Sequence, residues 1–182
     1  MKRWIYLFLL LSGLFAGACG SQQPAYTFVE EEGIGRIPVG RITRDVLMQD
    51  LYGQWFKAQY DEYRPDAATV KALKGRNYKG YRVDIYMGTW CPDSREHVPH
   101  FLKTADAIGF PEKQIRIFAL PRHYKEHSLV EGKNIIRVPT FIIYKDGKEL
   151  GRIIEYPMET PEKDFLRIID GKGYIHDYQQ QS

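Results

Sequence analysis

Apolar and polar positions divide the chain into three parts. Residues 4–18 are apolar almost without interruption, and residues 20–42 show no sustained period. From Thr43 onward, apolar positions recur at the four-residue spacing of helices or at the two-residue spacing of strands. Such alternation is typical of an α/β domain, which we expect over residues 43–175, followed by a polar tail at 176–182.

Four helices are predicted from apolar spacing and capping residues. Leu47, Leu51 and Trp55 share one side of the first helix, and Thr160 with Pro161 marks the start of the last. The predicted helices run from Thr43 to near Tyr60, from Pro65-Asp66 to before Gly75, from the motif at Cys91 to Gly109, and from Thr160 to Gly171.

Four strands are predicted from period-two alternation. They cover residues 81–87, 114–120, 140–144 and 149–154. Asp146-Gly147 predicts a tight turn that makes the last two strands antiparallel. The strand–helix–strand unit over 81–120 predicts parallel pairing with a right-handed crossover. Between 121 and 134 the pattern predicts no regular element.

The N-terminus has the pattern of a bacterial export signal. Lys2 and Arg3 precede an apolar run of 15 residues that ends at Ala18. A membrane-spanning helix needs about 20 apolar residues, so residues 1–18 are expected to be a signal peptide that is removed. Loss of Lys2 and Arg3 lowers the formal net charge from +3 to +1, which disfavours nucleic acid as a partner.

The cysteine that follows this signal allows two interpretations. The run Ala16-Gly17-Ala18-Cys19 resembles a lipoprotein site, where Cys19 is lipidated, but Ala-x-Ala is also accepted by ordinary signal peptidase at the same bond. We favour lipidation, which would hold the exported protein at a membrane through a tether over 19–42. A Cys19–Cys91 disulfide is the disfavoured alternative, because it would block the reactive atom of the motif at Cys91.

The main chemical motif is Trp90-Cys91-Pro92-Asp93-Ser94, which follows a predicted strand and begins a helix. Amide groups at a helix N-terminus favour a thiolate over a thiol, so Cys91 is the candidate nucleophile. Ser94 is able to donate a hydrogen bond to that thiolate but is unable to attack a disulfide. An inert buried thiol is the alternative interpretation of Cys91.

The order of elements and a set of specific residues resemble the thioredoxin family. The matching residues are Trp90, Pro92, Pro99, Val138-Pro139-Thr140 and the hairpin at 144–149. The resemblance covers residues 60–170. It implies a thioredoxin fold, with a central mixed sheet flanked by helices, a cis-proline turn at Pro139 and an extra N-terminal helical segment like those of exported thioredoxin-like proteins.

Two departures from the family pattern affect the chemistry. Ser94 stands where the family has its second cysteine, so the chain resembles an exported monothiol lipoprotein with a Cys-x-x-Ser motif. The family's buried acid, six residues before the cysteine, is replaced by Ile85, and Asp84 falls on the other face of the strand.

The resemblance implies a peptide-binding groove beside the thiol. Val138 and Pro139 would present backbone groups to an extended peptide, and Trp90 and Pro92 would line the same groove. We expect Cys91 to exchange disulfides of exported or unfolded proteins on the periplasmic side of the bacterial cell envelope. An external thiol would release the adduct, and no cofactor is expected.

Two other functions are the alternatives. A non-redox module would bind peptides or partner proteins in the same groove, with Cys91 incidental. A thiol peroxidase is disfavoured, because such enzymes usually place Thr three residues before the nucleophile, where this chain has Gly88.

The histidines raise the question of a metal site. His97 and His100 are three residues apart on the motif helix, and His123 and His127 lie in the weakly patterned stretch. We expect no metal site, because Cys91 to His97 is not a recognised ligand spacing and because solvated surface histidines explain the pattern.

Overall fold

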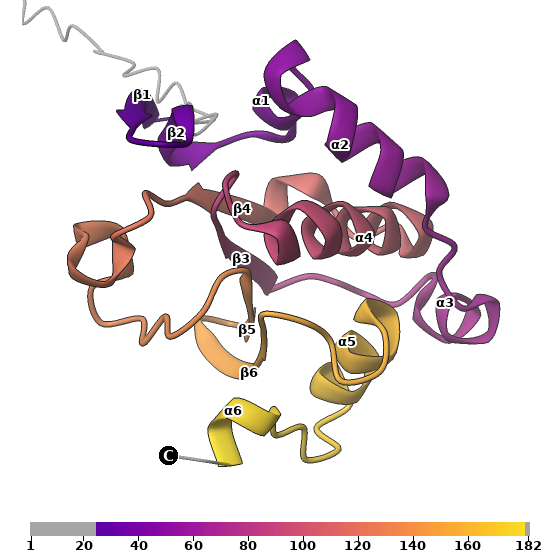
Figure 1. The fold of residues 1–182 in the computed structure, drawn as a ribbon. Coiled ribbons are helices and arrows are strands. Elements are labelled where there is room, and N and C mark those ends of the chain that lie inside the picture. The colour runs from indigo at the N-terminus through magenta and orange to yellow at the C-terminus, as the bar shows by residue number, and fades with distance from the viewer. Residues whose placement is uncertain (1–24, 181–182) are drawn as a thin grey trace, which may run out of the picture.

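The computed structural model describes residues 25–180 as a mixed six-stranded sheet flanked by helices (Figure 1). The predicted signal peptide and Cys19 lie outside the described residues. The strand order is β1-β2-β4-β3-β5-β6. The strands are β1 (Ala25–Glu31), β2 (Gly35–Ile42), β3 (Tyr81–Met87), β4 (Ile115–Ala119), β5 (Thr140–Lys145) and β6 (Lys148–Ile154). β3 and β4 pair in parallel, and β5 and β6 pair antiparallel, as the sequence predicts.

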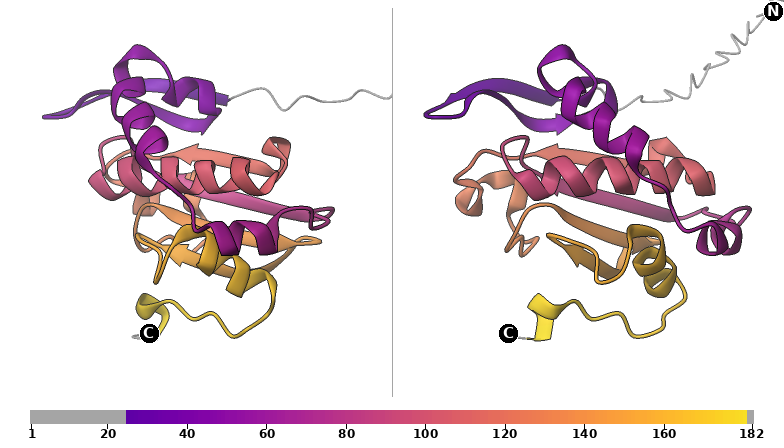
Figure 2. Two further views of the ribbon diagram at one scale, coloured as in Figure 1. Left: turned by 90° about the vertical axis from the view of Figure 1, so that its right-hand side faces the viewer. Right: turned by 45° about the vertical axis from the view of Figure 1, so that its right-hand side comes forward.

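Helices pack mainly against one side of this sheet. They are α1 (Arg44–Leu47), α2 (Asp50–Glu62), α3 (Ala67–Leu73), α4 (Pro92–Ile108), α5 (Pro161–Ile169) and α6 (Asp177–Gln180). Figure 2 shows α4 lying along the sheet, with α2 packed on α4 from outside. Within residues 25–180, no helix has the combination of length and hydropathy needed to cross a membrane.

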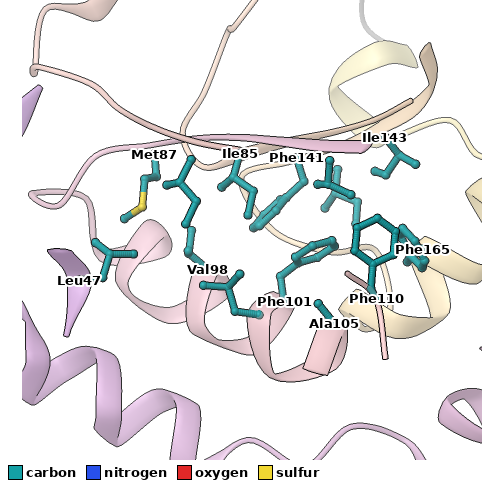
Figure 3. Packing of buried hydrophobic residues seen from close by; sticks show 14 of the residues in the cluster. Leu47, Ile85, Met87, Val98, Phe101, Ala105, Phe110, Phe141, Ile143 and Phe165 are labelled. Atoms are coloured by element: carbon teal, nitrogen blue, oxygen red, sulfur yellow. The ribbon is translucent and has the colours of Figure 1, made fainter. Parts of the chain in front are cut away.

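The larger hydrophobic core lies between the sheet and the helices (Figure 3). Val83, Ile85 and Met87 alternate along β3 and are fully buried on this side. Phe101 of α4 and Phe165 of α5 pack against the same face. Each such side chain contributes roughly 1.5–3 kcal/mol by leaving water, so this face fixes the direction of β3 and thereby the position where α4 begins.

The opposite face of the sheet is covered in part by residues 121–139, which include the stretch 121–134 where the sequence predicted no regular element. Residues 121–139 contain two short 3₁₀ turns, at 124–126 and 128–130. Tyr124, Val130 and Ile135 from this stretch form a second buried cluster with Tyr86 and Ile142 of the sheet. The stretch therefore has no long helix but still has its own core.

The prediction that residues 19–42 form a tether is wrong for residues 25–42. β1 and β2 form a hairpin, and Gly40 to Ile42 of β2 pair antiparallel with β4. Gly40 has φ +126, and a Cβ there would overlap the carbonyl oxygen of Ala25 on β1. Gly40, which makes this close pairing possible, interrupts the period-two pattern, as do Gly35 and Pro38.

The predicted helix from Thr43 to Tyr60 is two helices. Met48 and Gln49 separate α1 from α2, and Thr43 makes no side-chain capping bond. A Cβ on Gly53 would lie 2.6 Å from the carbonyl oxygen of Met48, so the bend depends on glycine there. The bend also turns Leu51 outward, to 60% exposure, which corrects its predicted inward position.

The predicted polar tail at 176–182 begins with a buried residue. His176 is 0% exposed, and its Nε2 lies 2.9 Å from the carbonyl oxygen of Tyr156. Its ring also stacks with Tyr178 of α6. The aromatic rings of His176 and Tyr178 therefore hold the chain up to α6 against the rest of the domain.

Candidate functional site

Cys91 occupies the junction between β3 and α4. A turn closed by the bond from Cys91 N to Gly88 O, at 3.0 Å, leads from the strand into the helix. Cys91 is the N-cap residue of α4, and Pro92 occupies the first helical position. The N–H that proline lacks would have no acceptor within the helix at this position, so no hydrogen bond is lost. The residue is 6% exposed and is a free thiol. The predicted strand–cysteine–helix arrangement is confirmed.

Two acceptor oxygens face the sulfur of Cys91. Sγ lies 3.2 Å from the carbonyl oxygen of Val138 and 3.7 Å from Oδ2 of Asp93. The side chain of Cys91 accepts no capping hydrogen bond from the first turn of α4. This geometry suits a protonated thiol that donates to Val138, rather than the amide-stabilised thiolate that the helix N-terminus led us to expect.

The Val138–Pro139 peptide bond is cis, as predicted. Both residues are buried, and β5 begins with the next residue, Thr140. The hydroxyl of Thr140 donates to the carbonyl oxygen of Arg137 at 2.7 Å, which closes this turn. The turn and the N-terminus of α4 thus lie together although 47 positions separate Cys91 from Val138.

Ser94 is close to the motif in sequence but does not bond the thiol. Its side chain is fully buried, and its Oγ accepts a hydrogen bond from the backbone N–H of Gly88 at 3.2 Å. Through this hydrogen bond, Ser94 connects the end of β3 to the first turn of α4. The donor bond to Cys91 that the sequence suggested is not among the contacts of the described residues.

Trp90 lies against the neighbouring loop. Its Nε1 donates to the carbonyl oxygen of Leu120 at 2.9 Å, and its ring stacks on Tyr124 at 6.4 Å between centroids. A Cβ on Gly88 would overlap the indole ring, so glycine is required beneath it. Trp90 is half-buried and Pro92 is exposed. These two predicted substrate-binding residues therefore border Cys91, with different access to solvent.

A group of residues that the sequence did not single out lies behind the cis-proline turn. The backbone N–H of Glu155 donates to the carbonyl oxygen of Pro139 at 2.6 Å, and Arg137 forms an ion pair with Glu155 at 3.8 Å. The hydroxyl of Tyr178 donates to Glu155, and this hydrogen bond raises the pKa of Tyr178 to about 12. No local pattern reports such contacts, because they join residues from three separate segments.

The acid that the family resemblance would place beneath the thiol is absent, as the sequence indicated. Ile85 is in the main core, and Asp84 is fully buried on the opposite face of β3. Asp84 is bound there by Arg116, with Nε 2.6 Å from Oδ1, and by Arg82. Both carboxylate oxygens of Asp84 have partners, so this carboxylate belongs to an ion-pair network away from Cys91.

The description of His97 and His100 as solvated surface residues is wrong. The side chain of His97 is 15% exposed, and His100 stacks against Tyr63 with 4.2 Å between ring centroids. Burial lowers the pKa of both imidazoles below the ordinary value, so both rings are neutral near pH 7. His123 is exposed, as expected, whereas Nδ1 of half-buried His127 accepts from Leu129 N.

Comparison with known proteins gives distant likenesses. No protein-family model and no curated protein matches the chain. A Pseudomonas aeruginosa protein of unknown function is 18% identical, with a TM-score of 0.49 over 66% of this chain and 82% of the other. An HIV epitope scaffold is 18% identical, with a TM-score of 0.48 over 65% of this chain and 82% of the other. The thioredoxin of Malassezia sympodialis is 15% identical, with a TM-score of 0.36 over 60% of this chain and 89% of the other.

Proposed function

We propose that this chain has a thioredoxin fold and acts as a monothiol in thiol–disulfide exchange through Cys91. The observation that carries the proposal is the position of the sulfur, at the N-terminus of α4 and 3.2 Å from the carbonyl oxygen of Val138 beside the cis-proline. A cysteine at a strand–helix junction, facing a turn that presents backbone groups, has a nucleophile and a peptide-binding edge in one place.

The proposed reaction has two exchange steps. The Cys91 thiolate attacks one sulfur of a substrate disulfide, the new Cys91–substrate disulfide forms, and the other substrate sulfur leaves as a thiolate. A small external thiol then attacks the mixed disulfide and regenerates the Cys91 thiolate. Ser94 takes no part in release, because a hydroxyl cannot form a disulfide and because its oxygen is bonded to Gly88 N–H.

Loss of the Cys91 proton has a consequence for substrate binding. In the thiol form, the carbonyl oxygen of Val138 accepts the hydrogen bond of Cys91. Once the proton has left, that oxygen is free to accept from a backbone N–H of an extended substrate. Activation of the nucleophile and opening of a binding position for the substrate are therefore coupled in this proposal.

The proposed location of the reaction rests on the export-signal pattern of residues 1–18. We propose export, removal of residues 1–18 and lipidation of Cys19, with the domain facing the periplasm. The substrates would be disulfide-containing or unfolded exported proteins, and the reductant would be an external thiol. Absence of palmitate incorporation at Cys19 in expressing bacteria would contradict the anchor while leaving the chemistry of Cys91 unaffected.

The test of the reaction is reduction of a peptide–glutathione mixed disulfide with glutathione as the external thiol. We expect Cys91→Ala to abolish the protein-dependent rate, while Lys71→Ala on the exposed surface of α3 retains it. Mass spectrometry of the unaltered protein should show a Cys91 adduct that glutathione removes. Equal rates for Cys91→Ala and the unaltered protein would refute the proposal.

A second candidate function is a peptide-binding module, which the low exposure of Cys91 favours. A cysteine that is 6% exposed and whose sulfur faces two acceptors is also what an unreactive thiol would show. Binding of an unfolded client with full affinity after Cys91→Ser, together with no exchange activity in the unaltered protein, would establish this alternative.

A further inference from the structure

Glu96, His97 and His100 form a cluster of possible metal ligands on α4. Each offers one ligand atom, and the three atoms lie within 4.8 Å of one another. Nδ1 of His97 is 4.0 Å from Oε1 of Glu96, and the two imidazole rings are 6.1 Å apart between centroids. The cluster is separate from the thiol, because none of the contacts of the Cys91 sulfur involves these three residues.

Residues of α2 and of the segment after it orient the ring of His100. Its Nε2 lies 3.1 Å from Oε1 of Gln59. Because that oxygen is an acceptor, the contact favours the tautomer with the proton on Nε2 and a lone pair on Nδ1. The ring of Tyr63 stacks on the face of the His100 ring, with 16° between the two planes. Metal-binding histidines commonly donate their second ring nitrogen to an oxygen in this way, which fixes the tautomer and the ring orientation.

Charge around the two histidines favours a cation. The carboxylates of Asp93 and Glu155 act on His97 in addition to Glu96, and those of Glu62 and Glu162 act on His100. A divalent ion would therefore have carboxylates near both histidines, of which Glu155 is already paired with Arg137.

We propose that Glu96, His97 and His100 bind one Zn²⁺ ion, with water in the fourth position. Two imidazole nitrogens and one carboxylate oxygen are a ligand set that zinc accepts, with an open position for water. Tetrahedral coordination with bonds near 2.0–2.1 Å places ligand atoms about 3.3 Å apart, so the cluster has to contract. The side chain of Glu96 is 55% exposed and is free to rotate inward.

The test is zinc binding by the purified chain without a polyhistidine tag. The chain should carry Cys19→Ser and Cys91→Ser, so that neither thiol contributes a ligand. Isothermal titration with zinc chloride should show one saturable site. We expect His97→Ala to weaken zinc binding at least tenfold. Gln59→Leu, which removes the side-chain amide that orients His100, should weaken it by about 10-fold or more. His123→Ala on the exposed loop is the matched control and should leave affinity unchanged.

A spectroscopic measurement separates coordination from loose surface binding. Co²⁺ in place of zinc should give the intense visible absorption of a four-coordinate ion in the control variant and not in His97→Ala. Circular dichroism checks that each variant is folded, and His97→Gln replaces His97→Ala if the latter unfolds. Absence of saturable zinc binding, or equal affinity in His97→Ala and the control, would overturn the proposal. Both outcomes are independent of the exchange chemistry, which the Cys91→Ser background lacks.

Discussion

Arg116 on β4 binds the buried carboxylate of Asp84 on β3 through both of its oxygens. The pair joins the two parallel strands on the face opposite α4, and Arg82 adds a third charge. A carboxylate that is 0% exposed is stable only while these partners remain, because an isolated buried charge is strongly unfavourable.

Asp84→Ala should therefore destabilise the domain by about 3–5 kcal/mol, because it leaves Arg116 without its partner in a partly buried position. Urea unfolding followed by circular dichroism measures the change. The double substitution Asp84→Leu with Arg116→Leu should recover most of the loss, since it removes both charges together. If the double variant is as unstable as Asp84→Ala, the loss comes from packing rather than from the unpaired charge.

The ion pair between Arg44 of α1 and Asp106 of α4 should make stability depend on pH. Burial alone would raise the pKa of Asp106, but hydrogen bonds from Arg44, at 2.6 and 3.0 Å, and from Tyr60 outweigh it, and the pKa is lowered below 3.8. A lowered carboxyl pKa gives stabilisation that is fully present above the unfolded value and is lost as pH falls through the folded value. Because the side chain is 37% exposed, solvent screening limits the effect to about 1 kcal/mol.

Asp106→Asn should accordingly lower the free energy of unfolding at pH 7, and this difference should shrink as pH falls below 3.8 toward the lowered pKa of the folded state. The exposed pair Lys57–Asp61 supplies the control, and Asp61→Asn should change stability very little across this pH range. A constant difference between Asp106→Asn and the unaltered protein from pH 7 to pH 3 would contradict the assignment.

Gly40 and Gly35 of β2 allow steric overlap to be separated from backbone strain. Both have positive φ, +126 and +93, but only a Cβ at Gly40 meets the backbone of β1. Gly35→Ala should cost about 1–2 kcal/mol for the left-handed backbone alone. Gly40→Ala should cost more, because β1 must also move away, and hydrogen exchange should rise across residues 25–31. Equal losses in the two variants would show that the hairpin accommodates the added methyl group.

Ser94→Cys should convert the proposed monothiol into a dithiol. The introduced sulfur attacks the Cys91–substrate disulfide, forms an internal disulfide with Cys91 and releases the substrate thiol without external glutathione. Release of a labelled peptide from the preformed adduct measures this step. Ser94→Ala should hold the adduct as the unaltered protein does, and persistence of the adduct in Ser94→Cys would show that the two positions cannot be bridged.

Elements with a strong repeating pattern were predictable from the sequence. β3 carries its core residues at alternate positions, α4 and α5 carry apolar residues at helical spacing, and the turn at Asp146-Gly147 joins β5 to β6. The cis bond at Pro139 was also anticipated, from the resemblance rather than from periodicity. In these segments local preference and tertiary packing agree, so the pattern is preserved.

The misses occur where distant partners decide the structure. β2 is held by β1 and β4 although Pro38 and two glycines obscure its pattern. His176 is buried by Tyr156, which belongs to another segment. Around the candidate sites, the bond from Glu155 to Pro139 and the contact of Gln59 with His100 depend on pairings that single-sequence spacing does not report.

The hairpin β1–β2 shortens the linker between the domain and the proposed lipid. A fully extended linker from Cys19 to Ile42 would span roughly 80 Å. Because β1 begins at Ala25, only six positions separate Cys19 from the sheet, and six residues span about 20 Å at most. On the proposal that Cys19 is lipidated, the domain would therefore stay within about one molecular diameter of the bilayer surface. Its partners would have to come to that surface, since the protein could not extend far into the surrounding compartment to meet them.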